Sequence, residues 1–256
     1  MKPVSLVLAT LLVTPALAVT QARPVAAAED AAAKGAAILK VADERAAAFP
    51  NQSYTASMDV KKGGKITKTL VFTMVMKDLE KQLISFTEPG DVAGMKILME
   101  DADTLYMYSP EFKKVRRIAA HTQSQGFLGS EFTPEDMKLS RLSTLFNAEL
   151  IGKTGTETTL VLTPKREEVT SYAKIEIVID SKVGGITKLR YIDGSGSAVR
   201  EQIRGGWVKH KGAQMPTEIS MKNLKTGDET VIRLSEIDVD TVIADDIFSR
   251  RTLMRG

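Results

Sequence analysis

The stretch that decides the fold is Tyr54-Thr-Ala-Ser-Met-Asp-Val60, followed by Lys61-Lys-Gly-Gly-Lys65 and Leu70-Val-Phe-Thr-Met-Val-Met76. In the first segment apolar residues alternate with Thr, Ser and Asp, and a period of two is typical of a β-strand. The double glycine between the segments is typical of a tight turn, so the stretch predicts a β-hairpin. One face of its second strand would carry Leu70, Phe72, Met74 and Met76.

Similar strand patterns recur on both sides of an irregular stretch, 119–146. Strands are expected near 81–87, 95–101, 103–109, 113–118, 147–153, 157–164, 173–181, 185–193, 197–207, 213–224 and 229–240. A spacing of about 8–12 residues, with turns rich in Gly, Pro and Asp, is typical of antiparallel strands in one large sheet, a barrel or a sandwich.

Two regions of the chain carry helix signals. Residues 29–49 are rich in alanine, with apolar residues at helical spacing, and Pro50 ends the pattern. Thr133-Pro-Glu-Asp136 combines a cap residue, a proline at the first helical position and acids in the first turn. We expect one or two short helices from there to about Phe146.

The N-terminus has the pattern of a secretory signal peptide. Lys2 precedes the apolar run 6–13, which is too short to span a bilayer, and Ala16-Leu-Ala18 forms a small-residue cleavage site. We predict a signal peptide over 1–18, with cleavage after Ala18 or alternatively after Ala28. A flexible leader, 19–28, and a single domain, 29–256, would follow, so the mature protein is expected to be exported and soluble.

Composition excludes several classes of function. The chain has no cysteine, which excludes disulfides, thiolate metal sites and a lipidated cysteine anchor. Its two histidines exclude a histidine-rich metal site, and the sequence gives no indication of any cofactor. A net charge of +3 from 35 basic and 32 acidic residues is too balanced for a dedicated nucleic-acid binder.

Signatures of catalysis are weak. Ser130 lacks the Gly-x-Ser-x-Gly context of a hydrolase nucleophile, and no acid is placed to orient His121. The Gly-rich segments 184–185 and 194–196 read as hairpin turns, because no helix follows them as in a phosphate-binding loop. We therefore predict that the protein is not an enzyme.

Methionine is concentrated in the first half of the predicted sheet. Strand alternation places a set of apolar side chains on one face, and these are the candidate lipid-binding residues: Met58, Phe72, Met74, Met76, Met95, Ile97, Met99, Leu105 and Met107. Flexible, polarizable methionine side chains adapt to irregular apolar ligands. The alternative is an ordinary hydrophobic core that uses methionine in place of leucine.

The stretch around 113–132 carries two further candidates. Arg116 and Arg117 could bind an anionic head group near a cavity mouth, or could simply protect a strand edge with charge. Phe127 and Leu128 lie between two glycines in a polar stretch, which fits either a mobile lid or a buried anchor.

Val115-Arg-Arg-Ile118 followed by Gln125-Gly-Phe-Leu-Gly-Ser-Glu-Phe-Thr-Pro-Glu-Asp136 resembles a motif of the outer-membrane lipoprotein-sorting proteins, the relatives of LolA and LolB. The family motif has Asp at the position of Glu131 and an aromatic residue at the position of Pro134. The tail Asp246-Ile-Phe-Ser-Arg-Arg-Thr-Leu253 is also similar to the family's closing pattern, and the similarity covers about residues 45–255.

The resemblance implies a strongly curved antiparallel sheet, an incomplete barrel. An N-terminal helix and a central helical insert would cover its concave face, where relatives bind acyl chains. The expected function is that of a monomeric periplasmic carrier of a lipid or lipoprotein, working with an envelope lipid transporter and an outer-membrane acceptor. Transient membrane contact would accompany transfer. The first alternative is an accessory subunit of such a transporter that carries no lipid. The second, ranked last, is a lipid-directed hydrolase.

Overall fold

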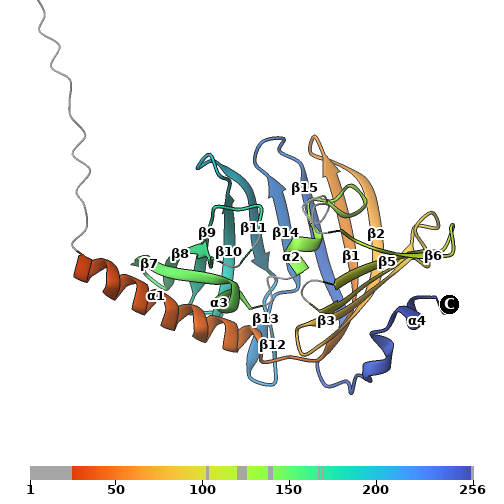
Figure 1. Ribbon diagram of the computed structural model, residues 1–256, viewed down its shortest axis with the longest axis horizontal. Coiled ribbons are helices and arrows are strands. Elements are labelled where there is room, and N and C mark those ends of the chain that lie inside the picture. The colour runs from red at the N-terminus through yellow and green to blue at the C-terminus, as the bar shows by residue number, and fades with distance from the viewer. Residues whose placement is uncertain are drawn as a thin grey trace, which may run out of the picture.

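Figure 1 shows the computed structural model of the 256-residue chain, which describes residues 25–101, 104–119, 126–137, 141–166, 168 and 170–254. Its main feature is one 13-stranded sheet in which every pair of neighbouring strands is antiparallel. Its strands are β1 (Gln52–Lys62), β2 (Lys65–Lys77), β3 (Lys81–Glu88), β4 (Lys96–Asp101), β5 (Thr104–Ser109), β6 (Lys114–Arg117), β7 (Phe146–Thr154), β8 (Glu157–Pro164), β9 (Lys174–Asp180), β10 (Gly185–Ile192), β11 (Ala198–Gly205), β14 (Glu218–Asn223) and β15 (Glu229–Asp238).

The strand order is β6-β5-β4-β3-β2-β1-β15-β14-β11-β10-β9-β8-β7. Strands β1 and β15 pair in the middle and join the first half of the chain to the second, with Met58 opposite both Leu70 and Ile232. The edge strands β6 and β7 do not pair with each other, so the curved sheet stays open (Figure 1). The prediction of a strongly curved antiparallel sheet, an incomplete barrel, is confirmed.

The predicted strand 213–224 is interrupted. Its first part is β13 (Ala213–Met215), which pairs outside the main sheet with β12 (Val208–His210), a strand that was not predicted. Pro216 lies at the break and has no N–H group to continue a ladder of hydrogen bonds. The chain rejoins the main sheet at Glu218.

The long helix α1 (Val25–Ala46) begins and ends earlier than predicted. Residues 25–28 are already helical, because a run of alanines favours helix strongly. Residues 47–49 are not helical, since the residue before a proline is disfavoured in the helical conformation. The predicted signal peptide, its cleavage site at Ala18 and the leader residues 19–24 lie outside the described residues.

Helix α1 covers the β7–β10 half of the concave face. Leu39 and Ala42 are buried in one core cluster with apolar side chains of β7 to β10, among them Leu160, Ile177 and Leu189. Asp43 extends this contact to α3 (Leu142–Leu145), where its carboxylate accepts hydrogen bonds from the N–H groups of Leu142 and Ser143 at 3.2 and 2.7 Å. This acid satisfies N–H groups that a helix start leaves without partners.

The central insert contains a short 3₁₀ turn, η2 (Phe127–Gly129), and the helix α2 (Pro134–Met137) ahead of α3. Helix α2 begins at Pro134, as predicted, and the backbone N–H and hydroxyl of Thr133 both donate to the Asp136 carboxylate, at 2.7 and 2.9 Å. In Figure 1 the helices α1, α2 and α3 lie on the side toward which the sheet curves.

The C-terminal segment packs on the opposite face of the sheet. It contains η3 (Asp245–Ile247) and α4 (Arg250–Leu253), and α4 contacts β4 and β5. Phe248 and Leu253 are buried there with Leu83 and Leu98. In the part of the chain that the structure describes, no helix is long and apolar enough to cross a membrane.

Gly35 allows α1 to approach the sheet closely. A Cβ at this position would lie 2.6 Å from the backbone oxygen of Ala148 in β7.

Replacing a helical glycine with alanine normally stabilises a helix by about 1 kcal/mol. We predict the opposite sign here: Gly35→Ala should lower the free energy of unfolding by about 1–3 kcal/mol, the usual cost of overpacking. Urea denaturation measures it, and the exposed Ala36→Ser is the control; a more stable Gly35→Ala protein would contradict the close packing.

Candidate functional site: an apolar cavity on the concave face

A cavity of about 900 Å³ lies on the concave side of the sheet. Its walls come from the end of α1, strands β1 to β4, the central insert, the β9–β10 turn, β11, β13 and the strands β14 and β15. Ligand sites in proteins usually have volumes of about 300–1,000 Å³ and mostly apolar linings with a few polar groups. The cavity has this size and this kind of lining.

One wall is the methionine-rich face predicted from the sequence. Of the candidate lipid-binding residues, those that line the cavity are Met58, Phe72, Met74, Met76 and Ile97. Met95 and Met107 pack against the same cluster without lining the cavity. Met99 and Leu105 are buried opposite each other in β4 and β5, also away from it. That these side chains bind lipid stays a prediction.

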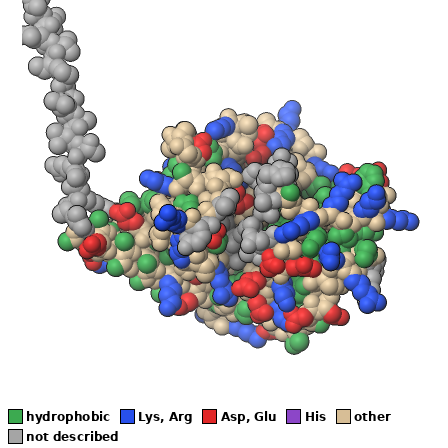
Figure 2. All heavy atoms as spheres, viewed as in Figure 1, with side chains coloured by type: hydrophobic (Ala, Val, Ile, Leu, Met, Phe, Trp, Pro, Cys, Tyr) green, Lys and Arg blue, Asp and Glu red, His purple; other side chains and the backbone are tan. Residues whose placement is uncertain are grey.

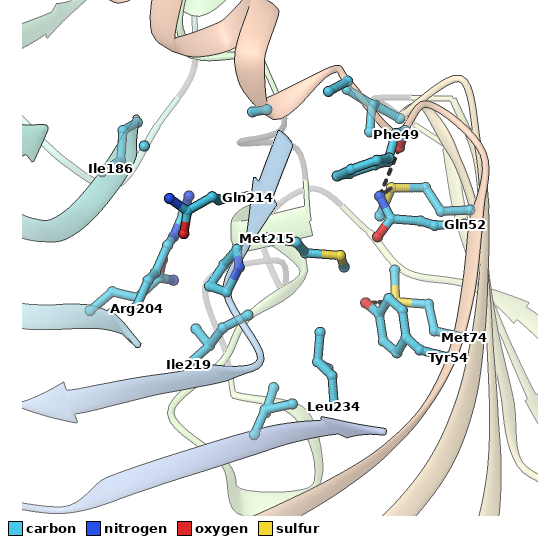
Figure 3. A pocket seen from close by; sticks show the side chains of 18 of the residues that line it. Phe49, Gln52, Tyr54, Met74, Ile186, Arg204, Gln214, Met215, Ile219 and Leu234 are labelled. Carbon is cyan, nitrogen blue, oxygen red and sulfur yellow. Dashed lines mark hydrogen bonds between the residues drawn. The ribbon is translucent and has the colours of Figure 1, made fainter. Parts of the chain in front are cut away.

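Two polar side chains of β1 brace the methionine wall. The Tyr54 hydroxyl donates to the Met74 sulfur at 2.8 Å, and burial raises the pKa of this hydroxyl, so it stays neutral. The Gln52 amide donates to the backbone oxygen of Phe49 at 3.0 Å and to the Met76 sulfur at 3.6 Å. These contacts orient two flexible thioethers without placing a charge on this wall (Figure 3).

The opposite wall is more polar. Figure 3 shows Arg204 and Gln214 close together there, facing Phe49, Gln52, Tyr54 and Met74 across the cavity. Arg204 extends a row on β11 in which Arg200, Gln202 and Arg204 share the concave face. The Arg204 Nε donates to the Gln202 side-chain oxygen at 2.8 Å. The apolar residue between them, Ile203, is 46% exposed on the other face.

An ion pair between Arg200 and Asp136 fixes the central insert to the sheet. Their side chains are about nine-tenths buried and the Nη2–Oδ2 distance is 2.7 Å. Arg200 also donates to the Glu131 backbone oxygen and to the Tyr172 hydroxyl, and its guanidinium lies 5.3 Å from the Tyr191 ring centre. Burial, the largest single influence, lowers the pKa of Arg200, but the charge and hydrogen bond of Asp136 together with Tyr172 and Tyr191 more than offset it and raise this pKa.

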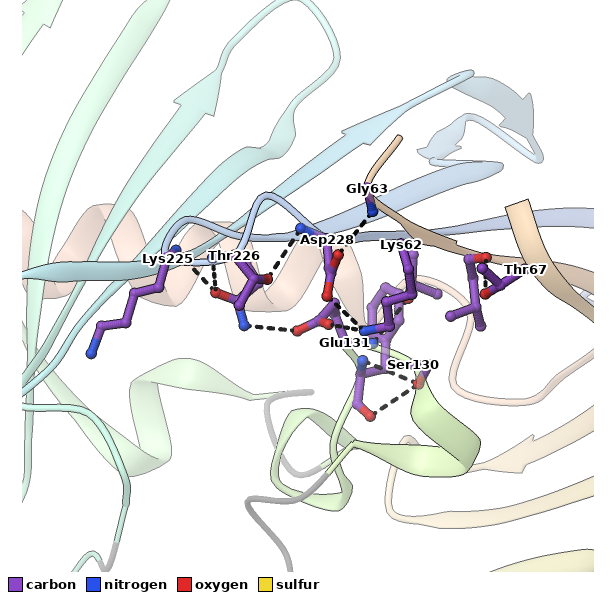
Figure 4. A network of polar contacts seen from close by, with 12 residues as sticks. Lys62, Gly63, Thr67, Ser130, Glu131, Lys225, Thr226 and Asp228 are labelled. Carbon is purple, nitrogen blue, oxygen red and sulfur yellow. Dashed lines mark hydrogen bonds and ion pairs between the residues drawn. The ribbon is translucent and has the colours of Figure 1, made fainter. Parts of the chain in front are cut away.

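A second polar cluster holds the insert to two hairpins (Figure 4). The Lys62 ammonium contacts Glu131 at 2.9 Å and Asp228 at 3.1 Å, and Asn223 donates to the other Glu131 oxygen at 3.2 Å. Hydrogen bonding to Glu131 is the main cause that raises the pKa of Lys62. Glu131, which stands where the resembled motif has Asp, therefore bridges the β1–β2 and β14–β15 hairpins.

Phe127 and Leu128 are half-buried between Gly126 and Gly129. Both pack against the methionine-rich cluster, and Phe127 lines the cavity. Gly126 is required sterically, because a Cβ there would collide with the Ser130 backbone oxygen, and Leu128 has a positive φ of 51°. Partial burial at the cavity wall fits the lid and the anchor equally, so the choice between them stays open.

Arg116 and Arg117 do not line the cavity. They lie in the edge strand β6 and are exposed, and Arg116 lies 6.0 Å from the centre of the exposed Phe112 ring. Arg117 pairs opposite Tyr106, on the face that α4 covers. The head-group role of these arginines stays a prediction. His121 lies outside the described residues, and Ser130 bonds to the backbone of Phe132.

The polar row Arg200-Gln202-Arg204 was not singled out from the sequence. Its signal is a strand on which polar residues recur with a period of two while the apolar residue Ile203 lies on the exposed other face. Such a reversed pattern marks polar groups turned toward the interior. Among the described residues, no group of three or more His, Asp or Glu side chains could hold a metal ion.

A family model described as "Uncharacterized protein" matches residues 78–255, and the chain belongs to this family. No curated protein matches the sequence. Among solved structures, an outer membrane lipoprotein-sorting protein domain from Vibrio parahaemolyticus is similar with a TM-score of 0.77 at 21% identity, over 88% of this chain and 100% of that one.

Two further structures agree with it. A DUF1329 family protein from Desulfovibrio piger has a TM-score of 0.77 at 23% identity, covering 91% of this chain and 100% of the other. A LolA superfamily protein from Nitrosomonas europaea has a TM-score of 0.70 at 21% identity, covering 84% and 97%. The chain therefore has the fold of the outer-membrane lipoprotein-sorting proteins, which confirms the resemblance at the level of the fold.

The buried ion pair predicts a large effect of one substitution. Asp136→Ala should lower the free energy of unfolding by about 3–5 kcal/mol, because it leaves the Arg200 charge buried without its partner. The control is Glu201→Ala, which removes the acid of the more exposed pair with Arg190 and should cost about 1 kcal/mol or less. Chemical denaturation measures both, and equal losses would contradict a special role for Arg200 and Asp136.

Proposed function

We propose that this protein is an exported, non-catalytic carrier that takes up the acyl chains of a lipid or lipoprotein and passes them toward the outer membrane. The observation that carries the proposal is the cavity of about 900 Å³ whose one wall is built from Met58, Phe72, Met74 and Met76. The lipoprotein-sorting description of a protein with the same fold agrees with it.

Capture would be driven by apolar burial, at about 0.8 kcal/mol for each methylene that leaves water. Several methylenes suffice for useful affinity, and methionine side chains can repack around chains of different shape. Release would need only an acceptor that buries the same chain as well, so the transfer requires no chemical step. The predicted signal peptide would deliver the protein to the periplasm, where a transporter and an outer-membrane acceptor would be its partners.

Mass spectrometry of organic extracts tests this proposal directly. The full chain, exported in a bacterial host and purified from the periplasm without detergent, is expected to retain lipid or lipoprotein-derived acyl chains at a stoichiometry near one. The control is an unrelated exported protein purified in parallel. A protein that carries no acyl chain, and takes up none from added lipid, would overturn the carrier proposal.

A charge on the methionine wall should abolish capture. Met74→Lys places an unpaired ammonium in an apolar cavity, which is costly, so lipid binding should fall by at least tenfold. The matched control is Thr73→Lys, the same change one residue earlier on the exposed face of β2, which should bind as the wild type does. Fluorescence titration with a neutral apolar probe measures binding, and circular dichroism checks folding. Equal affinity of the two folded variants would contradict the assignment of this wall.

The double change Phe127→Ser and Leu128→Ser separates the lid from the anchor. Because both side chains are only half-buried, we expect a loss of stability below about 2 kcal/mol, less than the cost of emptying a fully packed site. Transfer of a fluorescent lipid to acceptor vesicles should slow severalfold. A larger loss of stability with transfer unchanged in the folded fraction would identify the pair as an anchor only.

A further inference from the structure

Three cationic side chains gather at one end of the cavity. Arg204 lines it from β11, Arg45 from the end of α1 and Lys182 from the β9–β10 turn. The α1 end and this turn are in contact, because the Arg45 Nη1 atom lies 3.1 Å from the position that a Cβ of Gly184 would take. Arg45 and Lys182 are exposed, whereas Arg204 is half-buried.

The acids of the cavity lining do not neutralise these three residues. Asp136 is paired with Arg200, and Glu44 lies 3.9 Å from Lys40. Among the described residues, no carboxylate lies within ion-pair distance of Arg204, Arg45 or Lys182. Asp180, outside the lining, lies close enough to Lys182 for the charge of Lys182 to help lower its pKa. The excess of positive charge at this end of the cavity therefore comes mainly from Arg204 and Arg45.

The hydrogen bonds of Arg204 leave its terminal amino groups available. Its Nε donates to Gln202, and its backbone oxygen accepts from the Trp207 indole at 3.2 Å. Within the described chain no acceptor is bonded to either Nη atom. Burial lowers the pKa of Arg204, which shows that the site disfavours its charge. A partly buried arginine with available amino groups is strongly stabilised by a bound anion, because its planar guanidinium group binds a carboxylate or phosphate with two hydrogen bonds.

We infer that the cargo carries an anionic group, a carboxylate or a phosphate, and that Arg204 binds this group inside the cavity while Arg45 and Lys182 attract it at the rim. The acyl chain would then extend along the methionine wall on the opposite side (Figure 3). This inference rests on the proposed function and adds to it the chemical class of the cargo, an anionic amphiphile, and the residue that recognises its head group.

Matched ligands that differ only in the head group test the inference. Oleate, oleoyl lysophosphatidate and oleyl alcohol, each below its critical micelle concentration, displace the neutral probe N-phenylnaphthylamine from the full mature chain. We expect the two anions to bind at least tenfold more tightly than the alcohol, because hydrogen bonds between two charged groups are stronger than those to a neutral hydroxyl. Inorganic phosphate alone should not displace the probe or weaken oleate binding, because it lacks the chain.

Substitutions test whether Arg204 causes the preference for anionic ligands. Arg204→Met should bind oleate and oleyl alcohol equally, whereas Arg204→Lys should keep most of the preference. The control is Arg190→Met on the neighbouring strand, an exposed arginine outside the cavity, which should leave the preference intact. If Arg204→Met does not fold, the double variant Arg45→Gln, Lys182→Gln changes exposed side chains only and should lower the preference about threefold.

The failures of the two proposals are distinguishable. Equal binding of the alcohol and both anions by the wild type would overturn the anionic head group. A preference for anions that survives in folded Arg204→Met, or in the double variant if Arg204→Met does not fold, would overturn the assignment of head-group binding to these residues. Both results leave the apolar carrier intact. Phosphate that binds as tightly as lysophosphatidate would identify a free anion in place of a lipid head group. If neither the alcohol nor the anions displace the probe, the carrier proposal itself falls.

Discussion

The ion pair between Arg200 and Asp136 decides how the concave face of this sheet is covered. Helix α1 covers the β7–β10 half, and over the other half lies the central insert, whose described residues form only short helices. Apolar side chains of the insert such as Phe127, Leu128 and Met137 pack against the sheet, and two buried charges with their hydrogen bonds fix the insert there as well. Asp136 also organises the start of α2, and the same carboxylate thus sets the shape of the insert and its position.

The two halves of the concave face differ in chemistry as well as in cover. Under α1 the buried side chains are mainly Leu and Ile. Between β1 and β4 they are methionine and phenylalanine, and the packing leaves a cavity. Branched side chains with few rotamers suit a permanent contact, whereas flexible thioethers suit a surface whose partner changes. The distribution of methionine along the sequence therefore follows a division in the structure.

Much of the fold could be predicted from the sequence, because strand alternation and hairpin turns are local signals. The hairpin 54–76 and the start of α2 at Pro134 are examples. The candidate site was predicted only on its apolar wall. Arg204 and Gln214 come from segments far from Met74 in the chain, and only the curvature of the sheet makes them face it. Conversely, the basic run with Arg116 and Arg117 is conspicuous in the sequence, but it lies on an edge strand and does not line the cavity. In Figure 2, positively and negatively charged side chains are interspersed over the visible surface, so charge alone does not identify a binding site.

An open sheet has two edges, and each is a template on which a foreign strand could add. The edge at β6 is only four residues long, and three of these are Lys114, Arg116 and Arg117. Short length and positive charge are the common protections against edge-to-edge aggregation, because a second copy would bring the same charges into contact. The basic run then has a structural role independent of any cargo: it protects the exposed β6 edge of an unclosed sheet from the addition of another strand.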